Sequence, residues 1–203
     1  KVTVNSKVIR EKEEKKVKAE PEYNQLLVPA GKRVRVELSD GTRLVVNSQS
    51  KVIYPCRFNG DIRKIYAQGE VFLEVAHDKQ HPFIVESEDF KLRVLGTKFN
   101  VDAYPETEKF ETTLMHGSVK VTLKADSSQT VILKPDHKLS LEKGRFVMTK
   151  VEDYNPYRWK EGLICFSDES FPNIMKDFEI YKSCSLQLSI TFDETPSVIS
   201  SSR

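Results

Sequence analysis

Leu95-Gly96-Thr97-Lys98-Phe99-Asn100-Val101, near the middle of the chain, is the stretch that decides the fold. Apolar residues alternate with polar ones on both sides of its glycine, which is the period-two pattern of half-buried strands. A glycine inside such a pattern marks a bulge, a sharp bend or a close approach between backbones. We therefore predict a bent core strand around Gly96, since one glycine alone does not make a phosphate-binding loop. The alternating apolar positions are Leu92, Val94, Phe99 and Val101.

The same alternation continues outward over residues 23–150, with turn signals about every 8–12 residues. Asp40-Gly41 predicts a tight hairpin because both residues accept positive φ, and Asn59-Gly60 predicts a second one. No helical periodicity occurs before Val151. The expected fold is therefore mainly β: a two-sided β-solenoid or sandwich-like body of about a dozen short strands. The expected strands are residues 34–38, 44–46, 52–54, 62–66, 71–75, 83–85, 92–95, 99–103, 110–114, 119–123, 131–133, 139–141 and 146–148.

Different sequence patterns flank this body on both sides. Residues 1–22 contain a run of mixed charges without an apolar face, which is typical of a solvated tether. Residues 151–203 begin with an aromatic linker and then predict a small, truncated α+β domain of the strand–helix–strand kind. The apolar stripe of its helix needs more cover than two short strands give, so this domain is expected to be incomplete or open to a partner. The stripe consists of Phe171, Ile174, Met175, Phe178 and Tyr181.

Composition excludes several classes of protein. With 203 residues, 31% of them charged, and a net charge of +2, the chain has no global field for nucleic acid or anionic membrane. Its apolar runs are too short for a transmembrane helix or a signal peptide. Three widely spaced cysteines form no Cys-x-x-Cys pair and are expected to be small buried hydrophobes, although Cys165 and Cys184 could pair in an oxidising compartment. The third cysteine is Cys56.

The polar residues form no catalytic pattern. His77 and His81 have the four-residue spacing of a helical zinc site, but strands flank them, so a charged loop is expected instead. Glu70 and Glu74 should point to the same face of a strand. Exposure of that face to solvent explains the two carboxylates better than a catalytic acid–base pair does. His116 lies beside turn residues, as does His137. We expect no catalytic residue, no cofactor and no metal.

Several stretches, in order, resemble the FecR-like anti-sigma factors and sigma regulators, and most closely the extracytoplasmic part of Bacteroidetes-type members. The resemblance covers about residues 23–181 and rests on the order and spacing of its pieces; after Cys184 the sequence departs from the family. The matching pieces are Val28-Pro29-Ala30-Gly31, Leu38-Ser39-Asp40-Gly41-Thr42, Val46-Asn47-Ser48 with Ser50, Tyr54-Pro55, Gly69-Glu70-Val71-Phe72-Leu73-Glu74-Val75, Pro82-Phe83-Ile84-Val85, the central stretch with Tyr104, Leu114-Met115-His116-Gly117-Ser118-Val119, Leu133-Lys134-Pro135, Trp159-Lys160-Glu161-Gly162-Leu163 with Phe166, and the helix residues Phe178, Glu179 and Tyr181.

The resemblance implies a sensor and not an enzyme. Such proteins look like inner-membrane signal transducers, in which a periplasmic sensor meets the signalling domain of a TonB-dependent outer-membrane transporter. A cytoplasmic segment and one membrane helix are then expected before Lys1, the former holding a sigma factor of the extracytoplasmic-function (ECF) type. Residues 1–22 would be the tether, residues 23–150 the FecR-like body, and residues 151–203 the start of the small C-terminal domain.

We expect the partner to dock on the C-terminal strand–helix unit. Short strands there leave an edge whose free N–H and C=O groups can pair with an incoming strand, and the same edge offers a route to dimers. The alternative function is a carbohydrate-binding or adhesive β-module, which an aromatic platform would favour. The candidate aromatic residues, Tyr54, Phe58, Phe72 and Tyr104, fall at core-like or turn-adjacent positions. The predicted partner-binding residues are Leu163, Ile164, Phe166, Leu186, Leu188 and Ile190.

Overall fold

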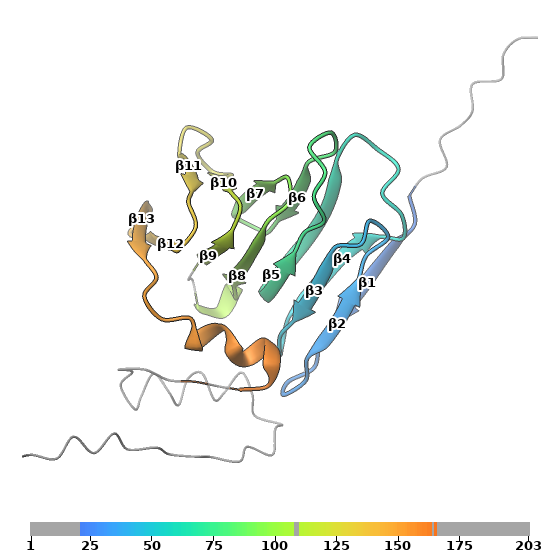
Figure 1. The fold of residues 1–203 in the computed structure, drawn as a ribbon, viewed down its shortest axis with the longest axis horizontal. Coiled ribbons are helices and arrows are strands. Elements are labelled where there is room, and N and C mark those ends of the chain that lie inside the picture. Colours follow the sequence, from blue (N-terminus) through green and yellow to red (C-terminus); the bar gives the residue numbers. More distant parts are fainter. Residues whose placement is uncertain (1–20, 108–109, 164, 166–203) are drawn as a thin grey trace, which may run out of the picture.

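The computed structural model of the chain describes residues 21–107, 110–163 and 165 (Figure 1). Over these residues the chain is mainly β, as the alternating pattern predicts, with 3-10 turns as its only helices. The strands are β1 (Tyr23–Leu27), β2 (Val34–Glu37), β3 (Arg43–Val46), β4 (Lys51–Pro55), β5 (Arg63–Glu74), β6 (Phe83–Glu86), β7 (Phe90–Val94), β8 (Lys98–Ala103), β9 (Glu111–His116), β10 (Val119–Leu123), β11 (Thr130–Leu133), β12 (His137–Glu142) and β13 (Arg145–Lys150), and the 3-10 helices are η1 (Pro105–Thr107) and η2 (Asn155–Glu161).

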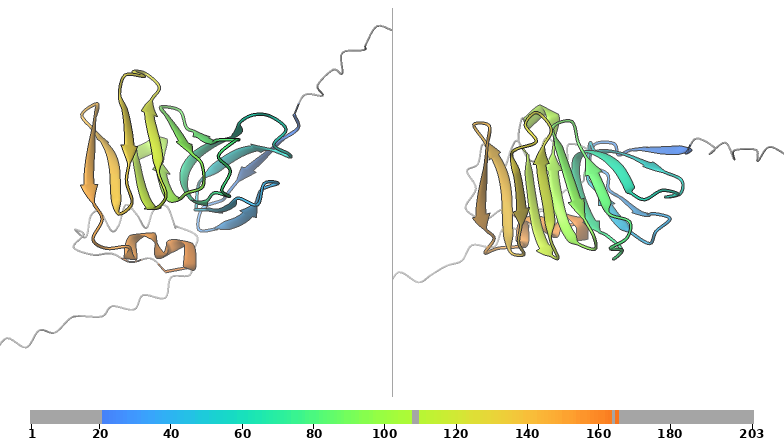
Figure 2. Two further views of the ribbon diagram at one scale, coloured as in Figure 1. Left: turned by 45° about the horizontal axis from the view of Figure 1, so that its top comes forward. Right: turned by 90° about the horizontal axis from the view of Figure 1, so that it is seen from above.

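The strands form two facing layers that share β5. Sheet A has the order β1-β4-β5-β6-β7-β10-β11, and sheet B has the order β2-β3-β5-β8-β9-β12-β13. After β5 the chain adds one hairpin to sheet A, then one to sheet B, and repeats this once, which gives the stack of hairpins seen in Figure 2. All neighbouring strands are antiparallel except β5 and β6. This is the predicted two-sided, solenoid-like body.

The structure has one long strand, β5, where the alternating pattern predicts two short ones. Residues 62–66 and 71–75 are not separate strands: β5 runs through both as a single strand of 12 residues. It bends at Gly69, whose φ of 87° is in the left-handed region that favours glycine. A Cβ there would lie 2.8 Å from the Cα of Ser50, so the bend also needs a residue without a side chain. The bend lets the first half of β5 pair in sheet A and the second half in sheet B.

The central stretch around Gly96 also differs from the predicted bent strand. Strand β7 ends at Val94 and β8 begins at Lys98, so residues 95–97 form a corner by which the chain passes from sheet A to sheet B. A Cβ on Gly96 would lie 2.7 Å from the Cα of His77 in a neighbouring turn. Of the three predicted roles of this glycine, the structure shows two, the sharp bend and the close approach between backbones.

Apolar side chains from both sheets meet between the layers. Along β5 the inward positions are fully buried, as the period-two pattern requires, and the largest buried side chains come from both layers. The Asp40-Gly41 hairpin is confirmed by the pairing of β2 with β3, but of its two turn residues only Gly41, at 82°, has the predicted positive φ. At the second predicted hairpin, β4 and β5 do pair, but Gly60 has no positive φ and the connection is a longer loop. The largest of the buried side chains are Phe83, Phe99, Leu44, Ile65, Leu73, Leu92, Leu114, Leu133 and Leu139.

No helix among the described residues has the length and apolar character needed to cross a bilayer.

Candidate functional site

The most elaborate polar site in the described structure is the place where η2 packs across the outer face of sheet B. The helix is short because Pro156 lies in its first turn and Gly162, with a φ of 104°, ends it in the left-handed conformation. Figure 1 shows η2 in orange below the strands of sheet B. The aromatic segment that the sequence suggests as a linker is therefore packed against the body.

Two buried aromatic residues anchor η2 to the sheet. Trp159 is 3% exposed and Tyr157 is 7% exposed. The Tyr157 hydroxyl is 2.6 Å from Oγ1 of Thr113 on β9. The ammonium group of Lys160 lies 4.6 Å from the ring centroid of Phe72 on β5, which is a cation–π contact. The outward-facing Phe72 is thus buried under η2, although it lies on the side of β5 away from the core.

Two arginines bind the C-terminal end of η2. The guanidinium group of Arg33 donates a hydrogen bond to the carbonyl oxygen of Trp159, and that of Arg35 donates one of 3.2 Å to the carbonyl of Lys160. These carbonyls belong to the last turn of the helix, where backbone acceptors lack helical partners and favour a cation. Residues more than 120 positions apart in the chain are therefore joined at this point.

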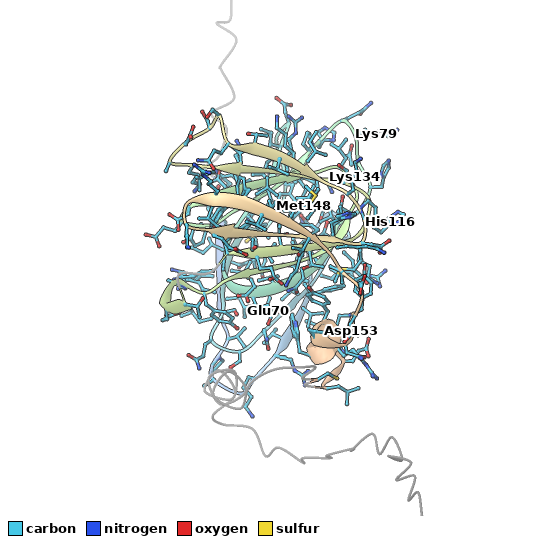
Figure 3. The ribbon with its side chains drawn as sticks, turned by 90° about the vertical axis from the view of Figure 1, so that its left-hand side faces the viewer. Glu70, Lys79, His116, Lys134, Met148 and Asp153 are labelled. Atoms are coloured by element: carbon cyan, nitrogen blue, oxygen red, sulfur yellow. The ribbon has the colours of Figure 1, made fainter. Side chains whose placement is uncertain are left out.

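Glu70 lies at the centre of the polar contacts beneath η2 (Figure 3). Its carboxylate oxygens accept hydrogen bonds from the side-chain amides of Asn47, at 2.7 Å, and Asn100, at 2.9 Å. The indole Nε1 of Trp159 faces the same carboxylate without reaching ideal hydrogen-bond geometry. No cation within the described residues pairs with Glu70.

Burial controls the charge of Glu70. Part of its side chain remains open to water, but protein atoms surround the carboxylate and raise its pKa from 4.5 to about 7. The amides of Asn100 and Asn47 and the indole of Trp159 favour the ionised form and limit the rise, while the negative charge of Glu111 adds to it. Near neutral pH, Glu70 is thus balanced between its charged and neutral forms.

Glu74, further along the same face of β5, has the opposite environment. Its carboxylate is 2.7 Å from the ammonium group of Lys98, and this hydrogen bond lowers its pKa. The structure thus confirms that Glu70 and Glu74 share a face, but a solvated face does not describe Glu70, which lies under η2. Glu70 binds Asn47 and Asn100, whereas Glu74 binds Lys98. The contacts of the two carboxylates are therefore those of a packing interface.

The histidines lie in loops or at strand ends: His77 and His81 are in the loop after β5, His116 ends β9 and His137 begins β12. Nδ1 of His81 is 2.7 Å from Oδ2 of Asp78, which lowers the pKa of Asp78 to about 2. Nδ1 of His137 is 2.8 Å from the carbonyl oxygen of Pro135. In the part of the chain that the structure describes, no three His, Cys, Asp or Glu side chains come together as metal ligands.

One cysteine differs from the prediction. Cys56 is exposed, because it follows β4 in a surface loop, whereas the sequence pattern predicts a buried hydrophobe. Cys165 is partly buried, and Cys184, its suggested disulfide partner, lies outside the described residues.

Of the predicted partner-binding residues, the structure describes the side chain of Leu163 only. It follows Gly162, the residue that ends η2, and is 45% exposed. The other five, Ile164, Phe166, Leu186, Leu188 and Ile190, lie outside the residues whose side chains the structure describes.

The candidate aromatic platform does not come together on the surface. Phe72 and Tyr104 are buried, and the Tyr104 hydroxyl donates a 2.7 Å hydrogen bond to the carbonyl of Ser48. Phe58 packs edge-on against the core residue Phe83, with 5.8 Å between their ring centroids. Tyr54 is partly buried and packs against the core.

Known proteins resemble this chain in part of its sequence and in its fold. A family model described as FecR protein matches residues 24–120. None of the curated proteins matches the chain. Two solved structures, each described as a "putative anti-sigma factor from Parabacteroides distasonis ATCC 8503", have a similar fold. The structure at 2.50 Å resolution has a TM-score of 0.72 and 27% sequence identity, over 79% of this chain and 76% of that one. The structure at 1.65 Å resolution has a TM-score of 0.71 and 27% identity, over 78% and 74%.

Proposed function

This chain is FecR-like and shares its fold with anti-sigma factor structures, and from that premise we propose that it is the periplasmic sensor part of a transmembrane anti-sigma factor. In this proposal the parent protein is anchored in the inner membrane, with residues 1–22 as the tether and residues 23–150 as the sensor body. It relays a signal from a TonB-dependent outer-membrane transporter to an ECF sigma factor through contacts between proteins and without enzymatic chemistry.

The docked helix η2 is the observation that best supports a relay. Trp159 and Tyr157 are buried against sheet B, and Arg33 binds the last turn of the helix. Residues 151–203, which we propose as the linker and the start of a C-terminal domain, therefore include near their beginning a segment that is fixed on the body. A partner that contacts Leu163 can thus act on the body through η2.

The partner in this proposal is the periplasmic signalling domain of the transporter, and it docks on residues after η2. The candidate contacts are Leu163, Ile164, Phe166, Leu186, Leu188 and Ile190. Leu163 supports this location because a large apolar side chain that is 45% exposed at the end of a packed segment is suited to an interface.

A truncation tests this proposal. The full chain and a chain that ends after Gly162 are titrated by calorimetry with the signalling domain of a TonB-dependent transporter from the same genome. The shorter chain keeps η2, so the emission of its single tryptophan, Trp159, should stay unchanged and show that the body is intact. We expect binding by the full chain and loss of binding by the shorter one.

Two results would contradict the proposal. Full-affinity binding by the shorter chain would place the partner on the body instead. Tight binding of saccharides on a glycan array, with no binding of the signalling domain, would favour a carbohydrate-binding module.

A further inference from the structure

The turns that join sheet A to sheet B stack along one edge of the body. They comprise residues 75–82, 95–97, 117–118 and 134–136, which we call the turn edge. Backbone hydrogen bonds link the first two turns: the amide of Asp78 donates to the carbonyl of Leu95 at 2.7 Å, and that of Val75 donates to Thr97 at 2.9 Å. The hydroxyl of Thr97 also donates to the carbonyl of Ser118 at 3.1 Å.

Two glycines make this stacking close. A Cβ on Gly96 would lie 2.7 Å from the Cα of His77, and one on Gly117 would lie 2.9 Å from the carbonyl oxygen of Gly96. Gly117 also has a φ of 95°, which other residues rarely adopt. Without side chains at these positions, the surface beside the turns is hollowed, and a groove of about 410 Å³ lies there.

The groove has two cations on adjacent strands. Arg93 of β7 and Lys120 of β10 lie directly opposite each other in the strand register. Like charges in this arrangement destabilise a sheet. Both side chains are on exposed residues, and no ion pair in the described structure involves either of them.

The acidic residues of the turn edge have other partners. Asp78 binds His81 at 2.7 Å, and Oδ1 of Asp136 accepts a hydrogen bond of 2.5 Å from the hydroxyl of Tyr154. Neither carboxylate is therefore directed at the cations of the groove. Figure 3 shows two further lysines, Lys79 and Lys134, on the same side of the molecule as His116.

Apolar side chains flank the cations. Ile132 of β11, next to Lys120 in the register, is 61% exposed, and Leu95 is 38% exposed. Both line the groove, together with His77. Apolar side chains beside cations without ion-pair partners fit a ligand that carries both acidic and apolar groups. An extended peptide with acidic and apolar residues in alternation is such a ligand.

We propose that this groove binds an acidic, partly apolar segment of a partner protein. The segment's carboxylates pair with Arg93 and Lys120, which removes the repulsion between these two cations, and its apolar side chains cover Ile132 and Leu95. A concave groove suits an extended segment better than the flat surface of a membrane. This contact lies on the β-rich body, apart from the C-terminal docking site of the proposed function.

Binding of a fluorescein-labelled peptide that alternates Glu and Val, measured by fluorescence anisotropy with the full chain, tests the proposal. We expect saturable binding that weakens with added salt, and on the order of tenfold or greater loss in the double variant Arg93→Glu, Lys120→Glu. The matched control, Lys51→Glu with Arg57→Glu, makes the same change in net charge away from the groove and should bind as the unmodified chain does. Circular dichroism establishes that each variant is folded.

Three outcomes would overturn the proposal. The first is no saturable binding of the peptide by the full chain. The second is an equal loss in the control variant, which would show binding to net charge alone. The third is binding of phosphatidylglycerol vesicles through Arg93 and Lys120 without binding of the peptide, which would identify a membrane contact. None of them bears on the truncation after Gly162, which tests the C-terminal docking site separately.

Discussion

Replacement of Glu70 by Gln should make the stability of this protein less dependent on pH. A carboxyl whose pKa is higher in the folded chain than in the unfolded one stabilises the fold fully below its unfolded pKa. That contribution is lost as the pH rises through the folded pKa. For Glu70 these limits are 4.5 and about 7, so the unmodified protein should lose stability between pH 5 and pH 8. The glutamine of the variant would stay neutral over this range, and its amide could donate to Oδ1 of Asn100, a buried atom without a hydrogen-bond partner in the described structure.

The size of the effect follows from the pKa values. The difference between 4.5 and about 7 corresponds to about 3 kcal/mol at about 1.4 kcal/mol per pH unit. Glu70 is partly open to water, which screens its charge, so we expect the gain in stability from Glu70→Gln to grow by about 1–2 kcal/mol between pH 5 and pH 8.

Urea unfolding at several pH values measures this difference directly. Trp159 is the only tryptophan of the chain and lies above Glu70, so its fluorescence reports on η2 as well as on unfolding. The matched control is Glu74→Gln, on the same face of β5, whose pKa is lowered by Lys98 and which therefore stays ionised from pH 5 to pH 8. A constant difference in stability between Glu70→Gln and the unmodified protein over this range would refute the assigned environment of Glu70.

Three further substitutions test the packing. Gly96→Val should destabilise the protein by about 1–3 kcal/mol in thermal unfolding, because its side chain meets the backbone of the adjacent turn, and an unchanged melting temperature would contradict the close approach. Arg33→Ala should shift the emission of Trp159 to longer wavelength as η2 loosens, with about 1–2 kcal/mol lost in urea unfolding; Lys32→Ala is the control, and no shift would mean that Arg33 does not hold η2. Arg63→Ala should cost about 3–5 kcal/mol, because it leaves the carboxylate of Asp40 without its buried partner, and a loss below about 1 kcal/mol in urea unfolding would argue against this ion pair.

Most strands of the body could be predicted because their inward-facing side chains are buried. Alternation of apolar and polar residues predicts such strands directly, and Asp40-Gly41 supplies a turn that needs no tertiary contact. The single strand β5 could not be predicted in the same way. Gly69 with Glu70 has the local sequence of a turn, and the chain continues as one strand because β3, β4, β6 and β8 pair with its two halves.

The site under η2 was out of reach of sequence patterns for a related reason. Arg33 alternates with apolar residues just as a solvated position does, and its contact with Trp159 joins the two ends of the body. Glu70 likewise has the spacing of an exposed strand residue. A signal did exist in the cluster of aromatic residues at Tyr157 and Trp159, because apolar rings of this size are rarely left in water. It points to packing without identifying the surface that is covered.

The strand shared by both sheets also determines how this body can open. Because β5 pairs with four other strands, in sheet A through its first half and in sheet B through its second half, one continuous backbone carries hydrogen bonds of both sheets. Melting of one sheet therefore loosens a strand on which the other sheet also depends, which does not happen between two independent sheets. The two layers form one cooperative unit, and local opening is confined to the outer strands, such as β1 and β13.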